Sequence, residues 1–275
     1  MRIDRRSLAI AFVSTCLTSC STSNPQPPID TSGSGSGSGS GGVAVGDDDS
    51  GSSADAGIYV PTGDFAVTGI LTDATQAVIA GAEMCLFTLP TGCVSTTTAG
   101  AFTLNGLTTG GSGIGITGAQ TGYVNGVWPL QPTSNLNSWS GYLRTPAQMT
   151  ALAAAVNAIT WSATTGVVHF LAFDGSGNDL SGVTVTTSAG GTIGYFTMDG
   201  STLNTSTTGV VETTADGGGM VFGLTAGTTV DVIFAAQGKT CVRSGSSGWT
   251  AVAATSTMSV PIVAGAVTFA GATCA

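Results

Sequence analysis

Few side chains in this 275-residue sequence could act as catalytic acids, bases or nucleophiles. The chain has one histidine, His169, between apolar neighbours in a strand-like run, and its only glutamates are Glu83 and Glu212. General acid/base catalysis needs titratable groups that share a pocket. The two glutamates are instead expected at exposed strand positions in separate halves of the chain. The sequence therefore predicts no catalytic residues, and a secreted hydrolase is kept only as an alternative.

Aromatic side chains gather in the segment that follows the first group of predicted strands. Trp128, Trp139 and Tyr142 lie there among polar residues such as Asn135 and Asn137. Exposed aromatic rings stack on sugars or on peptide side chains, and a polar rim orients such a ligand. The three aromatic residues are therefore the candidate site for a carbohydrate or protein ligand. The alternative is that the rings fill an interface between two domains.

Basic residues are scarce, and this excludes one class of partner. The formal net charge is -9, only 8% of residues are charged, and the basic residues after the N-terminal segment are Arg144, Lys239 and Arg243. Nucleic-acid binding depends on a basic surface that displaces counterions from phosphates. Nucleic acid is therefore not expected as a partner, and no cofactor is predicted. A surface of Gly, Ser, Thr and Ala is typical of an extracellular β-protein.

The N-terminus has the pattern of an export signal. A basic segment, Met1–Arg6, precedes an apolar run, Ser7–Leu17, which is too short to span a bilayer. The run ends at Leu17-Thr18-Ser19-Cys20, which resembles the lipobox of bacterial lipoproteins, in which the signal is cut before a lipid-modified cysteine. The resemblance implies a signal peptide at residues 1–19 and a membrane anchor at Cys20, placing the chain at the outer membrane or cell surface. An ordinary secretory signal is the alternative, and inner-membrane sorting stays open.

Residues 20–62 have the composition of a tether. Alternating Ser and Gly fill much of this stretch, and an acidic run, Asp47–Asp49, follows. Such a chain cannot bury enough apolar surface to fold and behaves as a flexible linker. The acidic run could hold Ca²⁺, but it lacks the complete ligand loop with a distal glutamate. A solvated linker is preferred, and no metal site is predicted.

The recurring pattern of the chain is a Thr-rich strand end, a Gly turn and a short strand that ends in Gly-Leu. It occurs at Thr96–Gly110 and again at Thr213–Gly227. Short strands separated by turns at regular spacing favour an all-β sandwich. One of these turns is expected at Leu89–Gly92. The copies predict two tandem antiparallel β-sandwich domains, at residues 63–143 and 161–275.

The cysteines fit this division of the chain. Cys16 belongs to the signal and Cys20 to the anchor, which leaves four cysteines in an oxidising compartment. We favour disulfides that stay within one copy of the repeat, since these need no bridge between domains: Cys85 with Cys93, and Cys241 with Cys274. Free buried thiols are the alternative. A zinc site is less favoured because the four cysteines are not spaced as two Cys-x-x-Cys clamps.

The first sandwich resembles a known family over about residues 64–130. Its segments Val67–Ile70, Ile79–Ala82, Thr98–Leu107 and Gly122–Tyr123 are similar to the strand and turn motifs of carboxypeptidase regulatory-like domains, which have a transthyretin-like β-sandwich. The resemblance implies a non-catalytic module that binds a ligand or supports a neighbouring domain. The second copy matches less well, because residues 194–209 add a segment that predicts an extra hairpin.

One segment breaks the β pattern. Thr145 is a suitable N-cap, Pro146 suits the first helical turn, and Met149, Leu152 and Val156 fall on one helical face. A short connecting helix is therefore expected within residues 144–160. The predicted function is a non-catalytic binding, adhesion or display role at the cell envelope, with a purely structural spacer as the main alternative.

Overall fold

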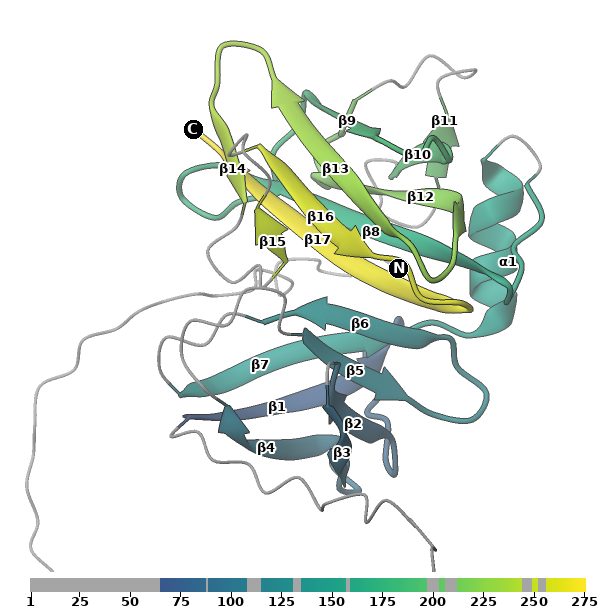
Figure 1. The fold of residues 1–275 in the computed structure, drawn as a ribbon, viewed down its shortest axis with the longest axis vertical. Coiled ribbons are helices and arrows are strands. Elements are labelled where there is room, and N and C mark those ends of the chain that lie inside the picture. The colour runs from purple at the N-terminus through teal and green to yellow at the C-terminus, as the bar shows by residue number, and fades with distance from the viewer. Residues whose placement is uncertain are drawn as a thin grey trace, which may run out of the picture. The chain divides into compact units, whose positions relative to one another are not determined.

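The protein is an all-β sandwich protein with one short helix, as the sequence predicts (Figure 1). The computed structural model describes residues 65–87, 89–107, 115–130, 135–156, 159–196, 203–205, 212–243, 249–251 and 256–275. The predicted signal peptide, Cys20 and the tether lie outside these residues.

The first repeat contains seven strands in two groups. In one group β1 lies between β4 and β7, and in the other β5 lies between β2 and β6, with β3 beyond β2. The pairing of β1 with β4 is antiparallel, whereas the pairing of β1 with β7 is parallel, so this sheet is mixed where the sequence predicts antiparallel pairing alone. The bounds are β1 (Phe65–Asp73), β2 (Glu83–Leu86), β3 (Leu89–Ser95), β4 (Ala101–Leu107), β5 (Gly115–Ala119), β6 (Asn125–Pro129) and β7 (Leu136–Leu143).

The second repeat has the same plan with added strands. Here β8 lies between β12, antiparallel, and β17, parallel, while β13 lies between β9 and β16. The added strands are β10, β11, β14 and β15, and β10 with β11 forms the extra hairpin predicted from the sequence. The bounds are β8 (Thr165–Phe173), β9 (Val183–Thr187), β10 (Thr192–Phe196), β11 (Leu203–Thr205), β12 (Gly218–Thr225), β13 (Thr229–Ala236), β14 (Cys241–Arg243), β15 (Thr250–Ala251), β16 (Thr257–Pro261) and β17 (Ala266–Cys274).

A buried threonine explains why the repeated motif begins as it does. The Thr96 hydroxyl donates to the carbonyl of Ile79 at 2.7 Å and accepts from the amide of Ala82 at 2.9 Å. Both backbone groups belong to the turn that precedes β2, and a buried turn needs such partners. The motif then turns at Gly100, whose φ is +72° and whose position leaves no room for a Cβ beside the Leu71 carbonyl.

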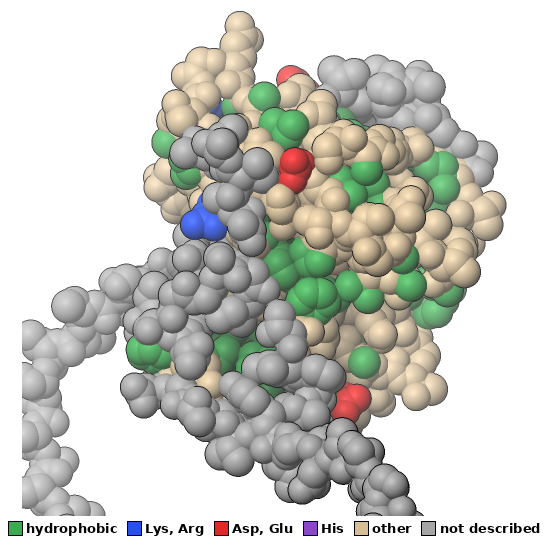
Figure 2. Space-filling model, viewed as in Figure 1, with side chains coloured by type: hydrophobic (Ala, Val, Ile, Leu, Met, Phe, Trp, Pro, Cys, Tyr) green, Lys and Arg blue, Asp and Glu red, His purple; other side chains and the backbone are tan. Residues whose placement is uncertain are grey.

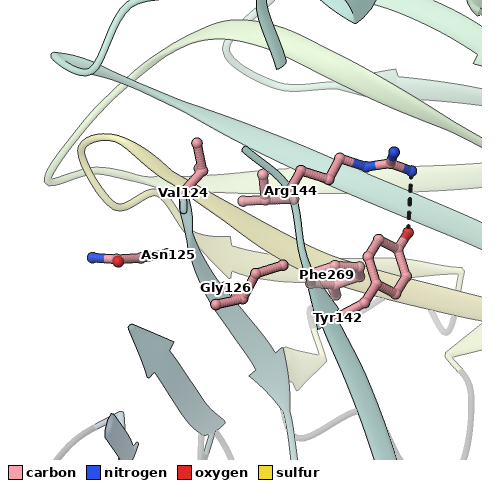
Figure 3. A pocket seen from close by; sticks show the side chains of 8 residues that line it. Val124, Asn125, Gly126, Tyr142, Arg144 and Phe269 are labelled. Carbon is pink, nitrogen blue, oxygen red and sulfur yellow. Dashed lines mark hydrogen bonds between the residues drawn. The ribbon is translucent and has the colours of Figure 1, made fainter. Parts of the chain in front are cut away.

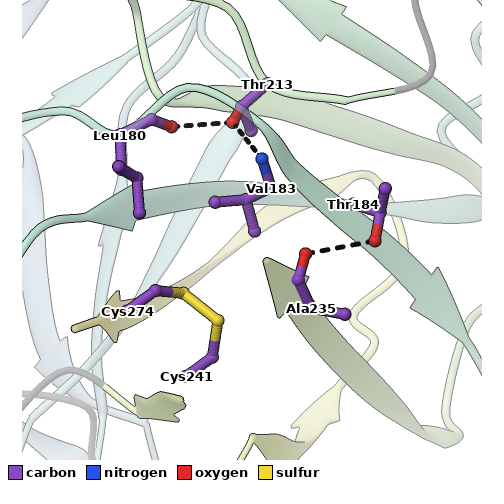
Figure 4. Close-up of a disulfide and its surroundings, with 7 residues drawn as sticks. All are labelled: Leu180, Val183, Thr184, Thr213, Ala235, Cys241 and Cys274. Carbon is purple, nitrogen blue, oxygen red and sulfur yellow. Dashed lines mark hydrogen bonds between the residues drawn. A yellow bond between two sulfur atoms is a disulfide. The ribbon is translucent and has the colours of Figure 1, made fainter. Parts of the chain in front are cut away.

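The second copy reproduces these bonds. The hydroxyl of Thr213 donates to the carbonyl of Leu180 at 2.7 Å and accepts from the amide of Val183 at 3.0 Å (Figure 4). The turn glycine, Gly217, has φ +62° and takes the place of Gly100. Equivalent residues therefore make equivalent bonds, which confirms that the two segments are structural copies.

The two repeats share a β-sheet. Strand β17 of the second repeat pairs in parallel with β6 of the first, with Val267 opposite Gly126, and this pairing links nine strands in one hydrogen-bonded order from β11 to β3. One core cluster includes Leu104 and Ile116 from the first repeat together with Met220 from the second. The division into two domains stays a prediction, but the repeats meet through a common ladder and a common core.

The connecting helix lies where it was predicted. Helix α1 spans Pro146–Ala155, and Thr145 caps it, with its hydroxyl accepting from the Gln148 amide while the Gln148 side chain accepts from the Thr145 amide. This reciprocal pair satisfies two of the free amide groups at the helix start. Met149 and Leu152 are buried, as expected. No helix in the described segments has the length and apolar composition needed to cross a bilayer.

Both predicted disulfides are confirmed. Cys85 is bonded to Cys93 in the first repeat, and Cys241 is bonded to Cys274 in the second (Figure 4 shows the latter). The turn expected at Leu89–Gly92 is wrong, because these residues begin strand β3. Pro90 is tolerated in β3 because β3 is an edge strand. Proline lacks a backbone amide hydrogen, and the unpaired side of an edge strand does not require one.

Removing the longer disulfide is expected to cost more stability than removing the shorter one. The sequence separations are 33 residues for Cys241–Cys274 and 8 for Cys85–Cys93. Loop-closure entropy predicts losses of about 3 to 4 kcal/mol for the first and about 2 to 3 kcal/mol for the second. Urea unfolding of the double variants Cys241→Ala/Cys274→Ala and Cys85→Ala/Cys93→Ala measures both values, and the opposite order would contradict the entropic account.

Candidate functional site

The structure brings the three predicted aromatic residues together. Trp128 lies on β6, Trp139 and Tyr142 lie on β7, and the two tryptophan rings meet edge to face with centroids 5.2 Å apart. Trp128 is only 6% exposed, and Trp139 and Tyr142 are half-buried. The expected exposed platform is therefore not what the rings form, and their placement matches the interface alternative.

Each tryptophan lies over glycines of its own and a neighbouring strand. A Cβ on Gly126 or Gly118 would collide with the Trp128 ring, and a Cβ on Gly141 would collide with the Trp139 ring. The glycines leave the sheet surface bare, and the rings cover it, an arrangement known to compensate for glycine in strands. One face of each ring is thus occupied by backbone.

The other side of Trp128 is occupied by the second repeat. Its ring stacks on Phe269 of β17, with centroids 5.2 Å apart and ring planes 16° apart, and Tyr142 meets the same Phe269 edge to face at 5.6 Å. His169 and Phe196 complete the group, with centroids 5.3 Å apart. We call these five residues the junction cluster. It packs where β6 and β7 meet β8 and β17.

A chain of polar groups runs through the junction cluster. The Tyr142 hydroxyl lies 3.0 Å from Nδ1 of His169. An Nη atom of Arg144 lies 3.5 Å from the same hydroxyl (Figure 3). A guanidinium can only donate, so the tyrosine oxygen accepts from Arg144 and its proton is directed to His169. The proton of the neutral imidazole is then on Nε2. That nitrogen has no hydrogen-bond partner within the described part of the chain.

The electrostatics of the junction cluster keep His169 neutral. Burial, with a smaller contribution from the nearby Arg144 cation, lowers the pKa of His169 from 6.5 to about 3. Burial also raises the pKa of Tyr142, although Arg144 opposes this shift. The Arg144 guanidinium itself lies over the Tyr142 ring at 5.2 Å from its centroid, a cation–π contact. None of the described carboxylates forms an ion pair with it.

A small cavity of about 10 Å³ lies beside these groups, between the ends of β6, β7 and β17 (Figure 3). Such a volume holds about one water molecule. Its lining is largely apolar, and the polar side chains in it are those of Asn125, Tyr142 and Arg144. The cluster is therefore a packed junction with room for a solvent molecule, and a sugar ring does not fit into it.

The remaining candidate residues do not form a second site. Glu83 is exposed on β2, as predicted, and Glu212 is exposed outside any strand. In the described segments one group of potential metal ligands occurs, Glu83 with Cys85 and Cys93. Because these two sulfurs are joined in a disulfide, they offer no thiolate to a metal.

Sequence reasoning missed the partners of the aromatic residues. The sequence predicts no catalytic role for His169 and does not connect it, Phe269 or Arg144 to the aromatic residues, yet His169 bonds with Tyr142 and Phe269 stacks on Trp128. A weak signal existed, since the only histidine of the chain and an isolated arginine flank the predicted helix on either side. The contacts of Phe269 arise from β17 and those of His169 from β8, and no local pattern places either strand next to β6 and β7.

Comparison with known proteins yields only distant structural likenesses. No family model and no curated protein matches the sequence. Among solved structures, the Bacillus anthracis TIE protein is 13% identical over 76% of this chain and 33% of its own, with a TM-score of 0.24. A streptococcal ancillary pilin is 13% identical over 75% of this chain and 62% of its own, with a TM-score of 0.22. The shaft pilin SpaA from Lactobacillus rhamnosus GG is 13% identical over 78% of this chain and 98% of its own, with a TM-score of 0.22.

The chain thus spans about a third of the first of these structures and less than two thirds of the second. Values this low do not allow a function to be inferred from the likeness.

Proposed function

We propose that this chain is a lipid-anchored envelope protein that displays a disulfide-bonded β-sandwich body in a non-catalytic role. The observation that carries the proposal is the disulfide in each repeat, Cys85–Cys93 and Cys241–Cys274. Such bonds persist in oxidising compartments and are rare in the cytosol. The lipobox-like Leu17–Cys20 and the tether at residues 20–62 supply an export route, an anchor and a spacer.

The surface composition supports display outside the cell. Among the described residues on the face in Figure 2, few side chains are acidic or basic, and polar groups and backbone outweigh the hydrophobic side chains. Adhesion to a carbohydrate or protein of the envelope is the finer proposal, and it is consistent with the likeness of the first repeat to carboxypeptidase regulatory-like domains.

A purely structural spacer is the second candidate, because the rings of Trp128 and Trp139 are used in packing. Sedimentation of the protein with insoluble envelope polysaccharide distinguishes the adhesion role from the spacer role. Saturable binding supports adhesion, whereas the absence of binding to polysaccharide and to surface proteins from intact cells supports the spacer.

Replacing Cys20 is expected to release the protein from membranes. In a bacterial host, Cys20→Ser removes the thiol that would carry the acyl chains, so the protein should move from the membrane fraction to the soluble fraction. Mass spectrometry of the N-terminal peptide would show the loss of lipid. The matched control is Cys16→Ser, which changes a cysteine inside the predicted signal and should leave the anchor intact. Equal membrane retention of both variants would contradict the anchor.

A further inference from the structure

The two repeats differ at one sheet edge. Strand β4 of the first repeat and β12 of the second are equivalent, since each carries the repeated motif and each pairs antiparallel with the first strand of its repeat, β1 or β8. In the second repeat the outer edge of β12 is covered by β10, which runs antiparallel to it, with Gly194 opposite Met220 and Thr192 opposite Phe222. An added antiparallel strand therefore fits this edge of the sandwich.

In the first repeat no described strand pairs with the outer edge of β4. The polar backbone groups of Ala101 bond to the preceding turn, away from β1: its amide donates to the Thr97 hydroxyl and its carbonyl accepts from the Thr97 amide. Directions alternate along an antiparallel strand, so the amides and carbonyls of Thr103 and Asn105 also point to the outer edge. These two residues occupy the positions of Met220 and Phe222, which face β10 in the second repeat.

Within the described residues, the edge of β4 lacks the features that normally prevent pairing. Proteins protect edge strands with charged residues, prolines or covering segments. Strand β4, Ala101-Phe102-Thr103-Leu104-Asn105-Gly106-Leu107, has no charged residue and no proline, and Thr103 and Asn105 are exposed. The neighbouring edge strand β3, by contrast, contains Pro90.

We propose that the outer edge of β4 pairs antiparallel with β4 of a second copy of this chain. The antiparallel direction is the one that β10 adopts on the equivalent edge. Two identical edge strands related by a two-fold axis run antiparallel to each other, and each contributes the same surface to the interface. With the sheet faces aligned, Thr103 and Asn105 of one copy lie opposite or diagonal to the same residues of the other, and none of these four side chains carries a charge that would oppose pairing.

The test is the oligomeric state of the full chain carrying Cys20→Ser, so that acyl chains cannot bring copies together. Analytical ultracentrifugation over a wide concentration range should show the mass rising from one to two chains. The amides of Thr103 and Asn105 should exchange with deuterium more slowly at high concentration. Thr103→Lys places like charges opposite or diagonal to each other across the pair and should keep the chain monomeric. Its melting temperature should equal that of the parent at concentrations where the parent is also monomeric.

The matched control is Asn125→Lys, an exposed strand residue on β6, whose two edges are already paired with β5 and β17. This variant should associate like the parent chain. A parent chain that stays monomeric at every concentration would overturn the proposal. Association of Thr103→Lys as strong as that of the parent would also overturn it, because another surface would then be responsible.

Discussion

Acidification from about pH 7.5 to about pH 5 is expected to lower the free energy of unfolding by about 2 kcal/mol through His169 alone. The pKa of this residue is about 3 in the folded protein and 6.5 as the reference value for an exposed histidine. Between these two pKa values, His169 is protonated in the unfolded chain and neutral in the folded chain. Stability is full above pH 6.5 and declines as pH falls toward 3, at about 1.4 kcal/mol per pH unit.

The surroundings of His169 explain why it stays neutral. Its side chain is 2% exposed and faces the Tyr142 hydroxyl, the Arg144 cation and the rings of Phe196 and Phe269. A second positive charge there would be desolvated and repelled by Arg144. Because the chain has no other histidine, the loss of stability between about pH 7 and about pH 5 is assigned to this residue. Burial and the nearby Asp216 raise the pKa of Asp179, and a raised carboxyl pKa stabilises the folded state on acidification, so Asp179 does not account for a loss.

The control for this prediction is His169→Gln, which keeps an acceptor for the Tyr142 hydroxyl but has no titrating group. Urea unfolding across the pH range should give a slope in the parent chain and a flat profile in the variant over the same range. A parent chain whose stability does not change between these pH values would contradict the buried, neutral state of His169.

Truncating Trp128 is expected to be the most damaging single change at the junction. Removal of a buried tryptophan side chain costs about 3 to 5 kcal/mol, as lost burial plus a cavity. Trp128 contacts Trp139 within its own repeat and Phe269 across the junction, so the loss weakens both repeats and their connection. Trp128→Ala should lower the urea midpoint accordingly, and Trp128→Phe, which keeps an aromatic ring, should lower it less.

Trp139→Ala provides the graded comparison. This residue is half-buried, so its truncation should cost less than that of Trp128, in proportion to the smaller area removed from contact. The result that would contradict the packing role is an unchanged stability of Trp128→Ala together with a loss of polysaccharide binding. That outcome would restore the ligand site predicted from the sequence.

Most features with a local signal in the sequence were predicted, although the turn expected at Leu89–Gly92 was not found. Thr145 and Pro146 mark the start of α1, and the Thr and Gly of the repeated motif mark turns whose hydrogen bonds recur in both copies. The pairing of Cys241 with Cys274 follows from the assumption that each bridge stays inside one repeat. These features depend on residues that are close in sequence or on the repeat itself.

Features that depend on distant strands were not predicted. The parallel pairing of β6 with β17 joins residues far apart in the chain, and no turn chemistry or periodicity encodes such a partner. The burial of Trp128 was not predicted for the same reason, since Phe269 covers its ring from β17. The sequence of one strand does not predict the burial of its aromatic ring when the residue that covers the ring belongs to the other repeat.

The position of β17 also affects how the chain reaches its folded state. This strand is synthesised long after β6 and β8, yet it pairs with both. Contacts between such distant segments slow folding, because a long loop must close before they form. Until then β6 has an unpaired edge that other chains could join. Crossing a membrane before β17 has paired would keep the polypeptide extended during that vulnerable interval, and the Cys241–Cys274 bond could then fix the strand once it has arrived.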